Sequence, residues 1–154
     1  MTKTYQNLIG GDWLPAASGA TFTSVNPADH TKVIGEFPAS GPADVEAAVT
    51  AARRAFPAWS SMPAPKRGEV LFRIARLLAE HKEELSRLMT EEMGKVLPEA
   101  RGDVQEAIDV AYYMAGEGRR LFGQTVPSEM PDKFAMAIRR PIGVVGIITP
   151  WNFP

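Results

Sequence analysis

The segment at residues 143–149 constrains the fold of this chain more than any other. It reads Gly-Val-Val-Gly-Ile-Ile-Thr, so apolar side chains would point to both faces of an extended strand. A strand that is apolar on both faces is typical of a parallel sheet with helices on each side. Such a strand needs parallel neighbours joined by crossover helices, and none follow it in these 154 residues. The sequence therefore predicts the first strand of an α/β layer in a truncated chain.

Helical patterns precede this strand. One helix is predicted over residues 42–56, starting with proline in its first turn and ending before Pro57. A longer helix is predicted over residues 66–92, where apolar residues recur at helical spacing. A third begins at Pro98 and ends in the glycine-containing stretch at 118–123. Three helices are thus expected ahead of the apolar strand.

Short β-prone pieces flank the helices. Residues 5–38 alternate between such pieces and turn residues, which predicts an irregular β segment with hairpins. Residues 134–140 are also β-prone, and 124–126 could pair with them across the polar turn between. The overall class expected from these patterns is α/β.

Composition excludes several classes of function. The net charge is −1, with 17 basic and 18 acidic residues spread along the chain, so no nucleic-acid or anionic-membrane footprint is present. No run approaches the ~18 apolar residues of a membrane span, and the first residues do not form a signal peptide. Because there is no cysteine to form disulfides, a cytoplasmic location is expected. The two histidines are isolated, so no metal site is predicted.

Asn152 is the leading candidate for chemistry. It follows the predicted strand at its carboxyl end, where open α/β sheets place their ligands. Its amide can donate two hydrogen bonds to a developing oxyanion. By local pattern alone, an asparagine at such a place is more often a turn residue than a catalyst.

The wider sequence favours the catalytic interpretation. Residues 140–154 read Arg-Pro-Ile-Gly-Val-Val-Gly-Ile-Ile-Thr-Pro-Trp-Asn-Phe-Pro, and this stretch resembles the opening of the cofactor domain in the NAD(P)-dependent aldehyde dehydrogenase superfamily. Four more matching motifs occur in the family's order: Ile9-Gly10-Gly11-Asp12-Trp13, Val25-Asn26-Pro27, Glu92-Met93-Gly94-Lys95 and Tyr112-Tyr113. The resemblance therefore covers nearly the whole chain.

The resemblance implies a domain organisation. Residues 1–123 would form the N-terminal helical part of the cofactor-binding domain, and 124–140 an oligomerisation hairpin. Residues 141–154 would form the first strand of the parallel, Rossmann-like sheet and the oxyanion turn. The implied complete enzyme is a homo-oligomer, either a dimer or a tetramer.

The resemblance also implies a reaction. An aldehyde, with the semialdehyde of a small dicarboxylic acid as the favoured class, would be oxidised to a carboxylic acid with NAD or NADP. In the family a cysteine thiolate attacks the carbonyl and a glutamate activates water. Since this chain has no cysteine, these 154 residues alone are expected to be inactive.

Residue roles follow from matching the family's motifs. Asn152 matches the oxyanion-hole asparagine. The stretch that lies along the cofactor matches Ile148, Thr149, Pro150, Trp151 and Asn152. For Ile148 and Pro150, strand packing alone explains the residue equally well.

Substrate and cation roles are also implied. Phe153 matches a position lining the aldehyde tunnel, and Gln105 and Asp109 lie on a helix face that could join it. The Val25 carbonyl and Glu92 match positions that hold a monovalent cation in some members, although Glu92 is better explained as a surface carboxylate at a helix end. Lys95 fits the end of a helix and is assigned no site.

Two alternatives remain open. The chain could be a non-catalytic interaction module, in which residues 124–140 pair with another protomer and the final strand seeks partners. CoA-acylating and phosphorylating relatives of the family share much of this architecture, so the chemistry could also differ. The Asn-Phe-Pro ending weakly favours the hydrolytic branch.

Overall fold

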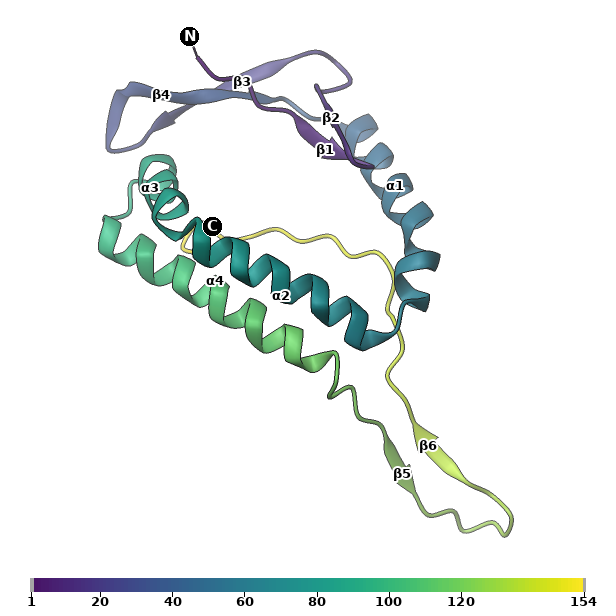
Figure 1. Cartoon of the computed structure of the whole chain (residues 1–154). Helices are drawn as coiled ribbons and strands as arrows, with labels where there is room; N and C mark the ends of the chain where they lie inside the picture. The colour runs from purple at the N-terminus through teal and green to yellow at the C-terminus, as the bar shows by residue number, and fades with distance from the viewer. Residues whose placement is uncertain (1, 154) are drawn as a thin grey trace.

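The computed structural model describes residues 2–153, and its α/β character confirms the predicted class. The elements in chain order are β1 (Asn7–Ile9), β2 (Asp12–Leu14), β3 (Thr21–Asn26), β4 (Asp29–Pro38), α1 (Pro42–Ser61), α2 (Ala64–Glu80), α3 (Lys82–Met93), α4 (Leu97–Glu117), β5 (Gln124–Val126) and β6 (Ala135–Ala137). In Figure 1 the β1–β4 hairpins lie over one end of the helices, and β5 and β6 project from the other end.

The N-terminal β segment forms two antiparallel hairpins, as predicted. Leu8 of β1 lies opposite Trp13 of β2, and the turn between the strands uses Gly10 and Gly11, whose φ angles of 65° and 100° favour glycine. Strands β3 and β4 pair with a register shift on either side of Val25. This irregularity bends the hairpin next to α3.

Helix α1 runs through Pro57 to Ser61, so the prediction that it ends before the proline was wrong. Proline removes one backbone donor, but the last turn is held by other bonds. The Ser60 hydroxyl donates to the Pro57 carbonyl at 3.2 Å, and the Met62 N–H donates to the Trp59 carbonyl at 3.3 Å. The turn after Pro57 is therefore hydrogen-bonded, although these bonds do not replace the one that the proline removes.

The single helix predicted over 66–92 is two helices, so the chain has four helices in residues 2–153 and not three. The break is at His81, whose φ of −100° and ψ of 12° leave the helical region. Both α2 and α3 pack against α4, so the apolar spacing continues across the break. For that reason periodicity did not reveal the bend.

The core is built on close contact between α2 and α4. Ala75 and Ala100 are fully buried, and Val104 and Ile108 of α4 are nearly so. At the other end of the pair, a Cβ on Gly68 would lie 2.6 Å from the Ala115 carbonyl oxygen, so only glycine allows this approach. Small side chains thus bring the two helix backbones together.

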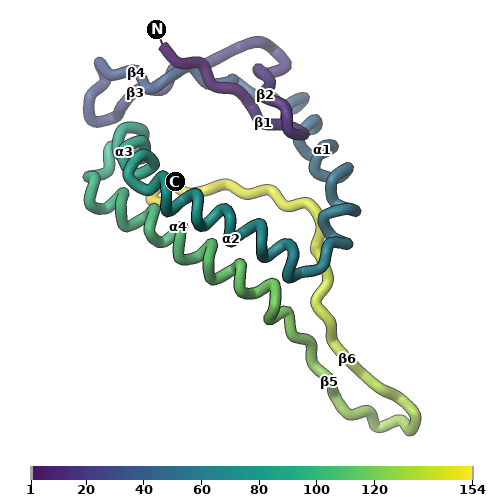
Figure 2. The backbone as a smooth tube through the Cα atoms, in the orientation of Figure 1, coloured from purple at the N-terminus to yellow at the C-terminus, as the bar shows by residue number. Residues whose placement is uncertain are grey.

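The hairpin predicted around 124–140 is confirmed as a structural element. Gln124 pairs with Ala137 and Val126 with Ala135, in antiparallel register. The tube in Figure 2 shows this hairpin extending away from the helices. Its predicted role in oligomerisation is not tested by its shape.

The strand predicted at 143–149 pairs with no other strand among residues 2–153. The segment runs extended past α1 and α2 and ends beside α3 and α4 (Figure 1). Ile148 is 97% exposed and Ile147 80%. These residues are thus extended but unpaired among residues 2–153, because a strand needs ladder bonds to neighbours that these residues do not supply. That they form the first strand of a parallel sheet stays a prediction.

Candidate active site

The chain ends in a tight turn that presents Asn152. The Phe153 N–H donates to the Pro150 carbonyl at 3.3 Å, which closes the turn over Trp151 and Asn152. Asn152 is exposed, so its side-chain amide can reach a ligand. This geometry is compatible with an oxyanion donor, and the catalytic role of Asn152 stays a prediction.

A lysine that sequence analysis left without a site holds this turn. The Lys95 ammonium donates to the Asn152 carbonyl at 2.9 Å and pairs with the Asp103 carboxylate of α4. It also lies 5.2 Å from the ring centroid of Phe153. The sequence offered one indication of this role, since Gly94 precedes Lys95. Gly94 ends α3 in the left-handed conformation, and this fixes the direction in which the chain continues at Lys95.

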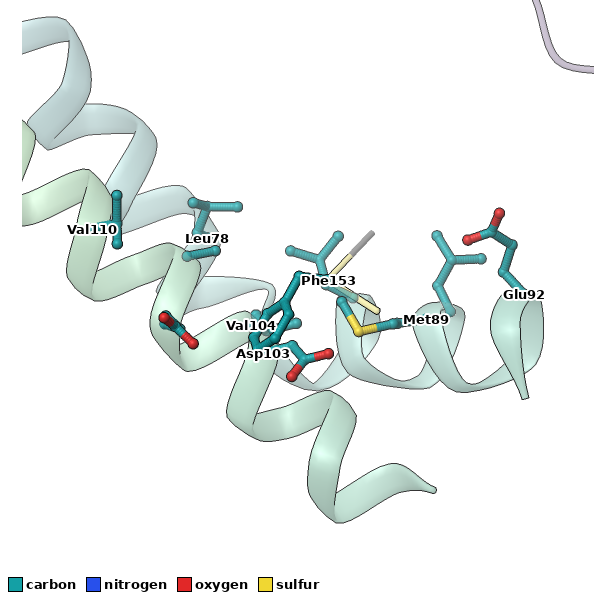
Figure 3. Close-up of a pocket in the computed structure, with 11 residues that line it drawn as sticks. Leu78, Met89, Glu92, Asp103, Val104, Val110 and Phe153 are labelled. Carbon is teal, nitrogen blue, oxygen red and sulfur yellow. The ribbon is translucent and has the colours of Figure 1, made fainter. Parts of the chain in front are cut away.

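Phe153 closes one side of a cavity of about 500 Å³ between α2, α3 and α4. In Figure 3 it reaches into the space between Met89 of α3 and Val104 of α4. The wall is mostly apolar, with three carboxylates among the lining residues. The lining residues are Leu78, Leu85, Leu88, Met89, Glu92, Asp103, Val104, Glu106, Ala107, Val110 and Phe153.

The structure does not bring Gln105 or Asp109 to Phe153. These two residues share a face of α4 as expected, since the Gln105 amide donates to Asp109 at 2.9 Å. That face is turned toward Lys82, whose ammonium donates to the side-chain Oε1 of Gln105 at 2.7 Å. The face beside Phe153 carries Asp103 and Glu106 instead, two residues that sequence analysis missed.

The stretch predicted to lie along a cofactor is accessible. Ile148 and Trp151 are 97% and 85% exposed, and Thr149 and Pro150 are exposed as well. The backbone of an extended segment without a paired strand can offer its N–H and C=O groups to a ligand. Exposure does not show that a cofactor binds here, so the cofactor role of these residues stays a prediction.

The cation candidates lie where α3 meets the β3–β4 hairpin. Glu92 is exposed near the end of α3, and Val25 is exposed at the irregular part of β3. A Cβ on Gly94 would lie 3.0 Å from Pro27, which shows how closely the two elements approach. Across residues 2–153, no group of three or more His, Cys, Asp or Glu side chains could hold a metal. The cation role of Val25 and Glu92 stays a prediction.

An exposed ion pair links α3 to α4. Arg101 of α4 makes two 2.8 Å hydrogen bonds to the Glu83 carboxylate of α3. The hydrogen bond from Arg101 lowers the pKa of Glu83, and the same pair raises the pKa of Arg101. Both side chains are exposed, so this pair orients the helices more than it stabilises them.

Comparison with known proteins identifies the chain. The pattern of the aldehyde dehydrogenase family matches residues 13–154. The chain belongs to the aldehyde dehydrogenase family. The resemblance inferred from the sequence motifs is thereby confirmed. The family match includes the turn at residues 150–153.

Several curated relatives of this aldehyde dehydrogenase segment are semialdehyde dehydrogenases. It is 42% identical over 152 residues to the α-ketoglutaric semialdehyde dehydrogenase of Bacillus subtilis (strain 168). It is 43% identical over 149 residues to the NADP(+) succinate-semialdehyde dehydrogenase of Escherichia coli (strain K12). These matches cover 99% and 97% of the chain but 31% of each relative. The chain therefore spans about a third of the length of these relatives.

Solved structures agree with this assignment. An NADP-dependent enzyme of E. coli matches with a TM-score of 0.93 and 42% identity, over 98% of this chain and 31% of that one. An NAD-dependent aldehyde dehydrogenase from Sinorhizobium meliloti matches with a TM-score of 0.92 and 40% identity, over 100% and 31%. The fold of residues 2–153 is thus the fold of the corresponding part of these enzymes.

Proposed function

We propose that these residues form the N-terminal part of an NAD(P)-dependent aldehyde dehydrogenase, in which Asn152 stabilises the oxyanion. The observation that carries the proposal is the exposed amide of Asn152 on a turn whose backbone is held by Lys95. Family membership supplies the reaction class: an aldehyde and water become a carboxylate as a hydride passes to the cofactor. Adding CoA or phosphate to the activity assay distinguishes this reaction from the alternatives in which CoA or phosphate accepts the acyl group.

Asn152 has a defined part in this chemistry. When a nucleophile adds to the aldehyde carbonyl, the carbonyl oxygen gains negative charge. An amide N–H already directed at that oxygen stabilises the charge without reorganising in the transition state. Because these residues contain no cysteine, they cannot supply the thiolate nucleophile of this reaction. We therefore expect the 154-residue chain to be inactive alone.

The accessible stretch before Asn152 suits NAD or NADP. Ile148 and Trp151 offer apolar surface, and the extended backbone at Thr149 can offer its N–H and C=O groups, whereas Pro150 has no N–H and its carbonyl accepts from Phe153. Apolar surface beside a few backbone donors and acceptors is the usual composition of a cofactor site. When bound, the cofactor accepts the hydride. Relatives named for each cofactor occur, so both are retained.

A semialdehyde of a small dicarboxylic acid is the proposed substrate class. The curated relatives named for α-ketoglutaric and succinate semialdehydes support it. Phe153 is the proposed tunnel residue of this chain, because it borders the cavity between the helices. The tunnel role of Gln105 and Asp109 is also kept as a proposal, although in this structure Gln105 bonds to Lys82 and to Asp109.

The complete enzyme is proposed to be a cytoplasmic homo-oligomer. The β5–β6 hairpin supports an oligomer, because it leaves the helices (Figure 2) with Phe134, Met136 and Val126 exposed. None of the helices in residues 2–153 is long and apolar enough to cross a membrane. The cytoplasmic assignment rests on the cysteine-free sequence.

The first experiment reads the coding sequence past codon 154. If the frame continues into α/β units with a cysteine and a glutamate, the full-length protein is purified and NAD(P)H formation is followed with succinate and glutarate semialdehydes. Acetaldehyde serves as the uncharged comparison, and added CoA or phosphate reveals the other acyl acceptors. Semialdehyde oxidation supports the proposal. A stop codon at this point, or a full-length protein without aldehyde oxidation, would overturn it.

The second candidate is an interaction fragment. The exposed apolar residues of the β5–β6 hairpin favour it, since an unpaired strand edge can bind another copy. Light scattering of the 154-residue chain and of a Phe134→Ser, Met136→Ser variant decides the matter. A stable oligomer that the double variant converts to a monomer would favour this candidate. A monomer in both cases would exclude it.

A further inference from the structure

We propose that Lys95 and Asp103 form a positioning pair that sets the orientation of Asn152 during aldehyde oxidation. This inference rests on the proposed function. Neither residue contacts the reacting atoms in the proposal. Lys95 acts on the backbone of Asn152, and Asp103 acts on Lys95. The pair would therefore decide how precisely the oxyanion donor is placed and would leave substrate affinity largely unchanged.

The pair differs from an ordinary surface ion pair. The side chains of Lys95 and Asp103 are 14% and 10% exposed. Lys32 and Glu91 also pair across two elements, at 2.6 Å, but their side chains are 48% and 44% exposed. Screening by water makes the exposed pair nearly neutral for stability, whereas removing one partner of a shielded pair leaves the other without its counter-charge.

Two hydrogen bonds and an aromatic ring fix the position of the Lys95 ammonium. An ammonium has three donors. One goes to the Asp103 carboxylate and one to the Asn152 carbonyl, and the Phe153 ring lies on the same side. These partners come from α4 and from the end of the extended segment. Lys95 thus fastens a segment that has no strand partners among residues 2–153 to the helical core.

Fastening the carbonyl of Asn152 restricts its side chain. The peptide between Asn152 and Phe153 is held through both of its polar groups: its carbonyl oxygen accepts from Lys95, and its N–H donates to the Pro150 carbonyl. With this peptide fixed, rotation about the Asn152 Cα–C bond is limited. Displacements of about 1 Å at such a donor cost up to about 100-fold in rate.

The test compares Lys95→Met and Asn152→Ala, separately and together, in the full-length enzyme. Methionine keeps most of the length of the side chain without the charge. We expect Lys95→Met to lower kcat about 10- to 100-fold with KM changed less than about threefold. In the double variant the loss should equal that of Asn152→Ala alone, because Lys95 acts through Asn152. Lys32→Met is the matched control and should leave kcat unchanged.

A conservative variant separates positioning from general packing. Lys95→Arg keeps a positive charge within reach of Asp103, so it should recover part of the kcat lost in Lys95→Met. Asp103→Asn should lower kcat in the same direction as Lys95→Met. Losses in Lys95→Met and Asn152→Ala that multiply in the double variant would overturn the proposal, and so would an unchanged kcat in Lys95→Met.

A readout that needs no turnover distinguishes failure of this inference from failure of the proposed function. Amide exchange at Phe153 reports the turn that contains Asn152. It should accelerate in Lys95→Met and stay the same in Lys32→Met. If the wild-type enzyme does not oxidise aldehydes, the proposed function is wrong even when this exchange result holds. An exchange rate at Phe153 that is the same in Lys95→Met as in the wild type would overturn the positioning role itself.

Discussion

The α2–α4 pair and the terminal segment at 141–153 are both rich in apolar residues, yet they have opposite environments. Ala75 and Ala100 are fully buried where the two helices meet, whereas Ile148 in the terminal segment is 97% exposed. The helices find their partners within residues 64–117. The terminal segment has no paired strand in residues 2–153, and its end is attached through the Lys95 contact. Burial therefore depends on which partners the surrounding chain supplies, and apolar character alone does not secure it.

Amide exchange should give the largest contrast between the two regions. In the 154-residue chain, residues 143–149 should exchange near the unprotected rate, and the buried parts of α2 and α4 roughly 1,000-fold or more slowly if stability is near the ~5 kcal/mol lower end for domains. In a full-length enzyme, neighbouring strands should protect 143–149 as well. Mass spectrometry of peptides from both regions measures this. Equal protection of both regions in the shorter chain would remove the contrast.

Asn152→Ala tests the functional end of the terminal segment. In the full-length enzyme we expect kcat to fall about 100- to 1,000-fold, which corresponds to about 3 to 4 kcal/mol of transition-state stabilisation. The exposed side chain of Asn152 contributes little to packing, so the thermal midpoint should change by less than about 2 °C. Initial rates and calorimetry provide the two values. Retained turnover would remove Asn152 from the oxyanion role.

Gly68→Ala tests the helical end of the comparison. The new Cβ would lie 2.6 Å from the Ala115 carbonyl oxygen, so α2 and α4 must separate, at a cost of about 1 to 3 kcal/mol in the free energy of unfolding. Gly102→Ala is the matched control in α4, because nothing lies within 4 Å of its added Cβ. It should stabilise by about 0.5 to 1 kcal/mol. Urea unfolding of both variants checks the opposite signs.

The smallest effect is expected at the start of α1. The Gly41 N–H and then the Ala17 N–H, each at 2.8 Å, donate to the Asp44 carboxylate and lower its pKa below 3.8. A lowered folded-state pKa means that this stabilisation is present above 3.8 and is lost as the pH falls below it.

Asp44→Asn removes the titrating group. Its midpoint of urea unfolding should be lower than that of the wild type at neutral pH. The gap should close as the pH falls from about 5 to about 2, because the wild-type carboxylate is then protonated. A gap that stays constant with pH would show that the two backbone hydrogen bonds do not depend on the charge of Asp44.

Much of the fold could be predicted from local signals. Pro42 at the start of α1, Gly94 at the end of α3 and the paired β-prone segments at 124–126 and 134–140 each act through a few neighbouring residues. The errors at Pro57 and His81 came from the same kind of rule. Helix α1 loses one backbone donor at Pro57 and still continues, with serine hydroxyls bonded in its last turn. Packing on α4 lets one apolar pattern continue across two helices.

The site was predicted in part. A short motif identified the turn that carries Asn152, because its residues are contiguous. The lining of the cavity beside Phe153 was harder to predict. Helical spacing correctly grouped Gln105 with Asp109, but spacing cannot tell which side of α4 meets Phe153. Asp103 and Glu106 were missed for that reason.

The sequence by itself determined the family, the order of helices and hairpins, and the turn at the end of the described chain. These depend on residues close together in the chain or on a contiguous motif. Tertiary structure alone decided that Lys95 meets Asn152 and Asp103, that Gly68 must be small, and that Ile148 is uncovered. Those facts depend on how separate elements pack against one another, and no local pattern records which group of another element will lie within reach.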